Sequence, residues 1–170
     1  MARNLVISDP HLAHENIIKY CNRPFKNADE MDEVIITNWN DEVADEDTVY
    51  MLGDFAFGRG SKEKLKLYLP QLKGRIILIR GNHDHETVGW YKRYGVADVH
   101  GGEVWKYEPY VLLSHRPYPT KHPWMNIHGH THNLMHIHPS GVYVNVSVEA
   151  IGYKPIDLDE LIERVRKGGC

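Results

Sequence analysis

The chain has 170 residues, of which 42% are hydrophobic and 25% are charged, and its formal net charge is −3 with the histidines neutral. These values are typical of one soluble globular domain spanning residues 1–170, and without a basic excess we expect no strong nucleic-acid binding. The N-terminal apolar run is too short for a signal peptide, no run is long enough to span a membrane, and two cysteines are too few for a disulfide framework. We therefore expect a cytoplasmic protein with no membrane partner.

Hydrophobic periodicity and turn residues place the expected elements along the chain. The first half alternates strands and helices: a strand at 5–8, a short helix opening at His14, a longer helix capped by Asp29, a strand at 48–52, a helix at 61–72 capped by Ser61, a strand at 76–79 and a helix at 86–94. Short strands at 96–99, 103–107 and 110–113 follow, and the Gly-Gly and Glu-Pro turns between them favour antiparallel pairing. The last elements are strands at 125–127 and 142–146 and a helix at 158–165 capped by Asp157.

Five of the apolar runs end in side chains that bind metals or transfer protons. These side chains are Asp9 with His11, Asp54, Asn82 with His83, His115, and His130 with His132. Open α/β sheets bind ligands beyond the carboxyl ends of their strands, so we expect the five ends to converge on one edge. The chain also has 12 histidines, six of them from His122 to His138, and this enrichment favours a metal site.

The chemistry of these side chains indicates the kind of metal. Carboxylates, imidazoles and one amide carbonyl are suited to a divalent ion of the Mn, Fe, Zn or Co class, and they are not the ligands of a thiolate zinc site. Seven ligands are too many for one catalytic ion that must keep an open position. Shared between two ions with one bridging carboxylate, they give four ligands to each ion.

The motifs Asp-X-His, Gly-Asp, Gly-Asn-His-Asp, a later lone His and Gly-His-X-His occur in this order between Asp9 and His132. Together they resemble the calcineurin-like metallophosphoesterase family, and in particular its small single-domain bacterial and phage members. The resemblance implies an α/β fold, a four-layer α-β-β-α sandwich of two mixed sheets with the active site at the C-terminal ends of strands. It also implies a role for each site residue: Asp9, His11 and His132 hold a first metal, Asn82, His115 and His130 hold a second, Asp54 bridges the two, and His83 acts near the leaving group.

One position departs from the family pattern. Larger phosphatases of the family carry Gly-Asp-X-X-Asp, in which the second Asp orients the acid histidine, and Phe57 stands at that position here. Either another group orients His83, with Asp84 and Asp9 as candidates, or His83 serves as a hydrogen-bond donor rather than as a tuned acid.

The predicted function is metal-dependent phosphoester hydrolysis by a hydroxide that bridges two ions, with manganese as the first expectation and Fe, Zn, Ni or Co as alternatives. The predicted catalytic residues are His83, Asp54 and Asp9. Arg23, Arg116 and His14 lie on loops that could face the substrate phosphate. The small size leaves no cap domain, and an open groove favours a diester, such as a nucleotide or a nucleic-acid end, over a monoester.

A second interpretation is a non-catalytic metal-binding scaffold on the same fold, a state that relatives reach by losing ligands. The complete ligand set favours the enzyme. The sequence leaves open the physiological substrate, the native metal and the oligomeric state, including a homo-oligomer. Among the remaining histidines, His128 is expected to pack under the site, and His136 and His138 to belong to a solvated hairpin.

Overall fold

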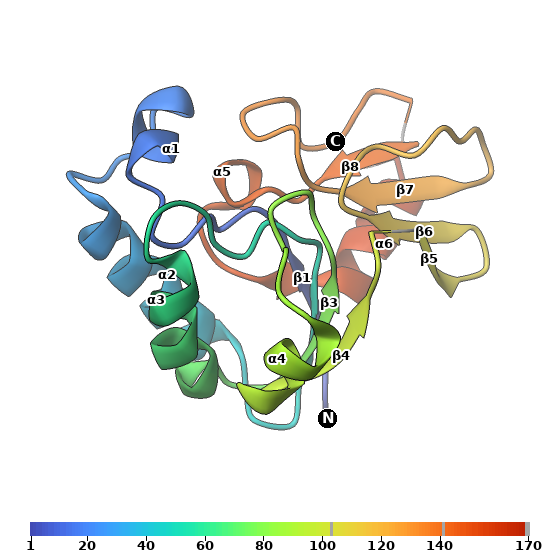
Figure 1. The fold of residues 1–170 in the computed structure, drawn as a ribbon. Coiled ribbons are helices and arrows are strands. Elements are labelled where there is room, and N and C mark those ends of the chain that lie inside the picture. Colours follow the sequence, from blue (N-terminus) through green and yellow to red (C-terminus); the bar gives the residue numbers. More distant parts are fainter. Residues whose placement is uncertain (103, 141, 169–170) are drawn as a thin grey trace.

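The structure, a computed structural model, describes residues 1–102, 104–140 and 142–168 and contains two mixed sheets (Figure 1). The larger sheet has the strand order β4-β3-β2-β1-β9, and the smaller has the order β5-β6-β7-β8. The strands are β1 (Asn4–Ile7), β2 (Thr48–Met51), β3 (Arg75–Ile79), β4 (Val96–His100), β5 (Trp105–Glu108), β6 (Val111–Ser114), β7 (Met125–His128), β8 (Tyr143–Asn145) and β9 (Ile156–Asp157). Strands β1 to β4 are parallel and β6 to β8 are parallel, whereas β9 and β5 are antiparallel to their neighbours. The predicted α/β fold with two mixed sheets is confirmed.

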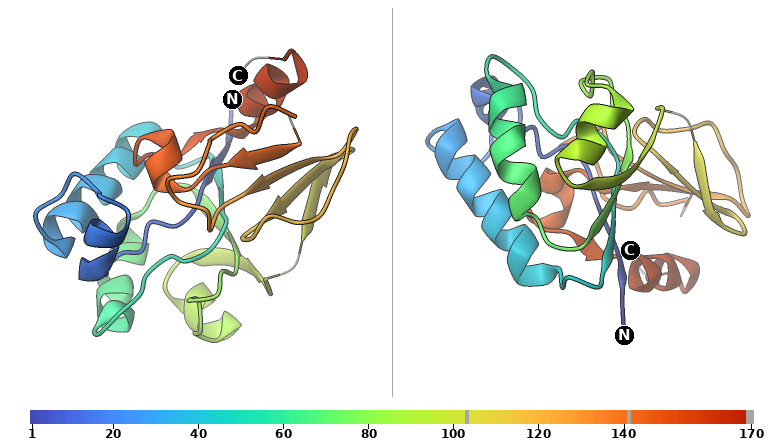
Figure 2. Two further views of the ribbon diagram at one scale, coloured as in Figure 1. Left: turned by 90° about the horizontal axis from the view of Figure 1, so that it is seen from above. Right: turned by 60° about the horizontal axis from the view of Figure 1, so that its bottom comes forward.

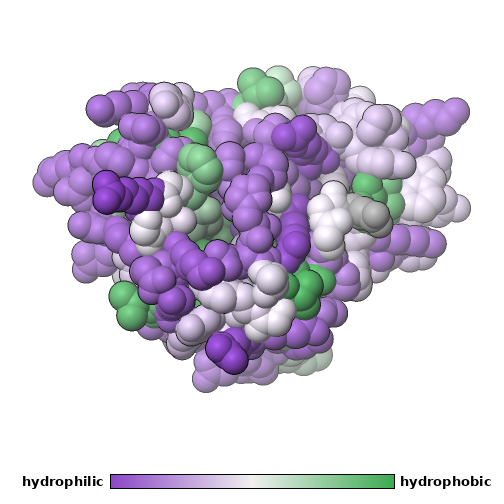
Figure 3. Space-filling view, viewed as in Figure 1, coloured by the Kyte–Doolittle hydropathy of each residue, from purple (hydrophilic) through white to green (hydrophobic). Residues whose placement is uncertain are grey.

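The helices connect the strands and cover the larger sheet. They are α1 (Glu15–Tyr20), α2 (Ala28–Glu42), α3 (Ser61–Tyr68), α4 (Val88–Arg93), α5 (Val148–Ile151) and α6 (Leu158–Arg166). Figure 2 shows α2 and α3 side by side on one face of the larger sheet and α6 on the other side of it. In the described ranges, no helix is both long and apolar enough to cross a membrane. The face drawn in Figure 3 is mostly hydrophilic, with small hydrophobic areas between polar ones.

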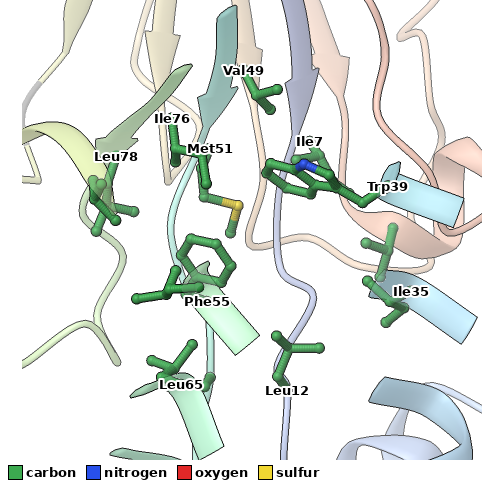
Figure 4. Packing of buried hydrophobic residues seen from close by; sticks show 14 of the residues in the cluster. Ile7, Leu12, Ile35, Trp39, Val49, Met51, Phe55, Leu65, Ile76 and Leu78 are labelled. Carbon is green, nitrogen blue, oxygen red and sulfur yellow. The ribbon is translucent and has the colours of Figure 1, made fainter. Parts of the chain in front are cut away.

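Two hydrophobic clusters stabilise this arrangement. The first lies between the larger sheet and its helices, where Trp39 of α2 and Leu65 of α3 pack over Met51 and Leu78 (Figure 4). The second joins the two sheets and includes Val6, Ile127 and four residues of α6. Because both faces of β1 and β3 are buried, these strands are apolar at every position after the first, as the runs in the sequence predict.

Several element boundaries differ from the prediction for local reasons. The cap of α2 is Asn27, not Asp29, because Asn27 has extended backbone and its side chain accepts a hydrogen bond from Glu30 N. Ser61 is the first residue of α3 rather than its cap, and the cap position is Gly60 with φ 82°. The α-helix stops at Tyr68 instead of continuing to residue 72, because Pro70 lacks the N–H that a helix needs and the chain tightens into a 3-10 turn.

The predicted antiparallel pairing of residues 96–99 is wrong. Strand β4 pairs in parallel with β3, because α4 provides the crossover that a parallel connection requires. The antiparallel pairing of β5 with β6 is as expected, although Glu103, the first residue of the predicted strand, lies outside the described residues. Helix α5 and strand β9 have four and two residues, too short for the periodicity of the sequence to predict them.

Candidate metal centre

Backbone pairing brings the ends of the two sheets together. Beyond β1, Ser8 forms a parallel bridge with Ser147, which follows β8. Asp9 N–H donates to Gly53 O at 3.0 Å, which joins the ends of β1 and β2. Gly129 N–H donates at 2.9 Å to the carbonyl oxygen of His115, the residue after β6. In Figure 1 the segments that leave β1, β2, β3 and β7 gather in the middle of the view. The strand ends therefore meet at one edge, as the sequence pattern predicts.

Five of the seven predicted ligands lie on left-handed backbone. Their φ angles are 58° at Asp9, 50° at His11, 55° at Asp54, 67° at His130 and 44° at His132. Such a conformation costs a non-glycine residue about 1–3 kcal/mol and is found mainly where the surrounding structure holds a functional side chain. Strain at these positions therefore indicates a site.

Two glycines allow loops to approach the carboxylates of the site. A Cβ atom on Gly81 would lie 2.2 Å from Asp54 Oδ1, and one on Gly129 would lie 2.2 Å from Asp9 Oδ2. No side chain fits at either position without displacing a carboxylate. The glycines in the Gly-Asn-His-Asp and Gly-His-X-His motifs are therefore required by close approach rather than by turn geometry.

Asp9, His11 and His132 form a first group of possible ligands, and their ligand atoms lie within 4.8 Å of one another. His132 also belongs to a similar group with Cys21 and Glu149. Asp9 Oδ1 and His11 Nε2 are buried and have no hydrogen-bond partner among the described residues. Burial lowers the pKa of His11, which keeps the ring neutral, and burial raises the pKa of Asp9. A divalent cation fits this group, because it would satisfy the unpartnered atoms and offset the cost of burying the carboxylate.

Asp54, His115 and His130 form the second group, again within 4.8 Å. His115 Nδ1 lies 2.9 Å from the carbonyl oxygen of Leu52, so Nδ1 carries the proton and Nε2 of a neutral ring is an acceptor. That Nε2 lies 3.0 Å from Asn82 Oδ1, which is an acceptor as well. Two acceptor atoms that face each other fit a cation between them, so Asn82 lies where a further ligand of this group could stand, and its role as a ligand stays a prediction.

Asp54 lies between the two groups. Its Oδ2 is 3.5 Å from His11 Nε2 in the first group and 3.4 Å from His115 Nε2 in the second. Its Oδ1 accepts a hydrogen bond of 2.8 Å from the backbone N–H of His83. One oxygen thus fixes the loop after β3, while the other faces both groups, which is the placement that a bridging ligand needs.

Glu149 is a site residue that the sequence reasoning missed. Its Oε1 lies 3.1 Å from His132 Nδ1, so His132 donates there and Nε2 remains available as a ligand. Burial lowers the pKa of His132, but the hydrogen bond to Glu149 and the charge of Asp9 outweigh this effect and raise it. Its place in the sequence could have revealed it, because Glu149 closely follows the end of β8, just as the other site residues follow their strands.

The predicted substrate contact of Arg23 is not what the structure shows. The Arg23 side chain is 0% exposed, and its NH2 donates to Glu149 Oε1 at 2.7 Å and to Asp9 O at 2.8 Å. Its other donors bind Pro10 O and Glu149. Arg23 therefore lies behind the first group, where it neutralises Glu149 and holds the loop that carries Asp9 and His11.

The other two predicted substrate residues lie at the rim. Arg116 is exposed and donates from NH2 to Asn82 Oδ1 at 3.2 Å, which places it next to the second group. The His14 ring is half-buried, with its centroid 5.5 Å from that of His11 and 4.8 Å from that of Phe57. Both side chains border the site, and substrate contact stays a prediction for them.

Phe57 packs directly on His83. Their ring centroids are 4.0 Å apart, and the His83 side chain is 29% exposed. Asp54 Oδ2 lies 3.9 Å from His83 Nε2, which is too far for a hydrogen bond. An aromatic contact with Phe57 and the backbone hydrogen bond to Asp54 thus hold His83.

Asp84 does not orient His83. Its Oδ2 accepts from Asp54 N at 2.7 Å and from Gly81 N at 2.8 Å, and its Oδ1 accepts from Phe55 N at 3.1 Å. Burial raises the pKa of Asp84, and the backbone hydrogen bonds act in the opposite direction. This carboxylate ties the loop after β2 to the loop after β3. Asp9, the other candidate, is directed to the first group.

The remaining histidines lie outside the two groups. His128 is buried beneath the site, with Nδ1 2.9 Å from Gly129 O, as expected. His136 Nδ1 lies 2.6 Å from Asn145 O, and its Nε2 lies 3.0 Å from Arg164. His138 Nδ1 bonds Ser140 Oγ at 2.9 Å. The pairing of His136 and His138 with protein groups agrees with the hairpin interpretation.

Comparison with known sequences gives two relatives of similar length. An uncharacterized protein of Methanocaldococcus jannaschii is 39% identical over 176 residues, which cover 99% of this chain and 94% of that protein. The gene 66 protein of Mycobacterium phage L5 is 29% identical over 189 residues, which cover 86% of this chain and 87% of that protein.

Solved structures share the fold. A protein of unknown function from Aquifex aeolicus is similar with a TM-score of 0.70 and 28% identity, over 96% of this chain and 99% of that one. The nuclease MPE of Pseudomonas putida is similar with a TM-score of 0.53 and 22% identity, over 76% of this chain and 62% of that one. The family model described as calcineurin-like phosphoesterase matches residues 2–164. With this match and the assembled strand-end motifs, the chain belongs to the calcineurin-like phosphoesterase family.

Proposed function

We propose that the chain hydrolyses phosphodiesters with the aid of two divalent metal ions. Asp9, His11 and His132 would hold one ion, and Asn82, His115 and His130 would hold the other. The observation that carries the proposal is the position of Asp54, whose Oδ2 faces an imidazole of each group at 3.5 and 3.4 Å. We propose manganese first, because every ligand atom is oxygen or nitrogen, with Fe, Zn, Ni or Co as alternatives. The free thiol of Cys21 agrees with a cytoplasmic location, which is also part of the proposal.

The chain contributes placement and charge to this reaction. When bound, two divalent ions supply positive charge at the phosphate oxygens and lower the pKa of a water molecule. Asp9 and Asp54 are held rigidly by backbone N–H donors and by the loops that carry them. Arg116, beside Asn82, can donate to a phosphate oxygen, and the part-exposed His83 ring can donate to the departing oxygen.

Two cavities support a diester substrate. One of about 240 Å³ is lined by His83 and by none of the predicted ligands, and another of about 270 Å³ is lined by Asn82, His115 and Arg116. A monoester has one organic arm, whereas a diester has two. A phosphate at the ligand groups would have room for one arm in each cavity, so the diester fits better.

The direct test compares bis(p-nitrophenyl) phosphate with p-nitrophenyl phosphate before and after metal removal. We expect hydrolysis of the diester to exceed that of the monoester, to stop after treatment with chelator, and to return with Mn²⁺. Undiminished hydrolysis by thoroughly metal-free protein would overturn the proposal. A protein that binds two ions but cleaves neither ester would instead be the metal-binding scaffold.

His83→Ala is expected to lower diester hydrolysis by about 10- to 100-fold, at or below the low end for general acids. The reason is that no carboxylate in the described part of the chain hydrogen-bonds the His83 ring, which instead packs on Phe57. Both metals should stay bound, because His83 is not a predicted ligand. The measurement compares an activated nitrophenyl diester with an alkyl diester, together with the metal content.

If His83 acts as an acid, His83→Ala loses more activity on the alkyl diester than on the nitrophenyl diester. If His83 only donates a hydrogen bond, the loss of activity is similar for the two diesters and reaches about 10²–10³-fold. Full activity of His83→Ala on the alkyl diester would show that His83 has no catalytic role.

A further inference from the structure

The cavity beside His83 has an apolar and aromatic floor. Ala56, Leu65 and Tyr91 line it and are 6%, 4% and 1% exposed. Tyr91 is held by burial, and its hydroxyl makes a long contact of 3.4 Å to Asp84 Oδ1, the same carboxylate that ties the two loops together. The floor is therefore held by the framework of the site rather than by a free surface loop.

Phe57 forms a wall that the cavity shares with the reaction centre. Its ring is half-buried, lines the cavity, and contacts the ring of His83 at a centroid distance of 4.0 Å. A group that enters the cavity would thus lie against Phe57 and next to the side chain proposed to act on the departing oxygen. The cavity is in the right place for the leaving arm of a diester.

The charges at the rim cancel. Lys62 Nζ lies 2.6 Å from Glu86 Oε2, and the same ammonium lies 5.6 Å from the ring centroid of Trp90. With its cation already paired, the rim offers little attraction to a second phosphate. An uncharged group with a polar edge suits it better, since Ser61 and His85 at the rim can form hydrogen bonds with such an edge.

The volume limits what fits. At about 240 Å³ the cavity is smaller than the roughly 300–1,000 Å³ of sites for drug-sized ligands. A single planar ring system can enter and stack on Phe57, because planar rings pack well on aromatic faces.

We propose that this cavity, bounded by Phe57, Leu65 and Tyr91, binds a planar uncharged ring such as a nucleobase on the leaving arm of the substrate. The inference rests on the proposed phosphodiesterase function and deepens it, because it makes the enzyme selective for diesters that release a nucleoside-like alcohol.

The test uses two methyl phosphodiesters, one with adenosine linked through its 5′ oxygen and one with 2-methoxyethanol, both of which release a primary alcohol. The measured quantity is the ratio of kcat/KM for the adenosine diester to that for the methoxyethyl diester. Ser61→Phe, which fills the cavity from α3, should lower this ratio by about tenfold or more, a typical effect of losing one stacked base. Phe57→Leu, which keeps an apolar contact with His83 but removes the aromatic face, should lower it in the same direction.

The matched control is Leu67→Phe, which adds the same ring to α3 at an exposed position outside the cavity and should leave the ratio unchanged. Binding of free adenosine, followed by NMR shifts of Phe57 and Leu65, gives a readout that needs no hydrolysis. Wild-type hydrolysis with an unaltered ratio in both cavity variants would overturn the cavity assignment and leave the proposed function intact. If neither diester is hydrolysed, the proposed function fails, and the absence or presence of adenosine shifts still decides the cavity.

Discussion

Asp54→Asn is expected to abolish the binding of both divalent ions and to lower diester hydrolysis by more than about 100-fold. Removing only a hydrogen-bond partner of a metal ligand already costs up to about 100-fold, and Asp54 is itself the proposed shared ligand. Asp54 Oδ2 faces both ligand groups, at 3.5 Å from His11 Nε2 and 3.4 Å from His115 Nε2. The substitution removes the negative charge but keeps an oxygen that can accept from His83 N. The loops should therefore keep their conformation while the site loses its shared ligand.

Metal content of the purified variant and thermal unfolding with and without Mn²⁺ are the measurements. The wild type should gain stability when Mn²⁺ is added, because the ions bind only the folded chain, and the variant should not. The control is Asp45→Asn, the same change on an exposed loop. An Asp54→Asn protein that still binds two ions and retains its activity would show that Asp54 is not shared.

Asp84→Ala is expected to cost at least about 3 kcal/mol of the free energy of unfolding. The Asp84 carboxylate accepts from three backbone N–H groups, those of Asp54, Phe55 and Gly81. Each buried donor left without a partner costs about 1–3 kcal/mol. Such a loss is a large share of the roughly 5–15 kcal/mol that stabilises a typical domain. Urea unfolding of the metal-free protein measures the change without any contribution from bound ions.

Asp84→Asn should lose less than Asp84→Ala, because the amide oxygen can still accept one or two of these hydrogen bonds. Asp45→Ala, on an exposed loop, is the matched control and should change stability by less than about 0.5 kcal/mol. If Asp84→Ala unfolds like the wild type but loses the leaving-group dependence of hydrolysis, Asp84 acts through His83 after all, and the structural role is wrong.

The sequence by itself determined which residue types stand at the strand ends. An apolar β-branched run predicts a buried strand, and the residue after it must emerge at the sheet edge, so Asp9, Asp54 and His115 could be placed near one another without coordinates. The structure gathers them into two groups within 4.8 Å. The glycines next to them belong to the same local signal, because Gly81 and Gly129 occupy positions where no Cβ fits.

Only the tertiary structure decided how the long side chains are used. Arg23 could point toward solvent or toward the core, and it turns inward because Glu149, 126 residues away, provides a buried counter-charge. Asp84 is sequence-adjacent to His83, yet its carboxylate bonds the backbone of another loop. The direction of β4 was also set by tertiary structure, through the α4 crossover. Arg23 and Asp84 bind groups that lie 126 and 30 residues away in the chain, and no local pattern records a contact that forms only when the loops meet.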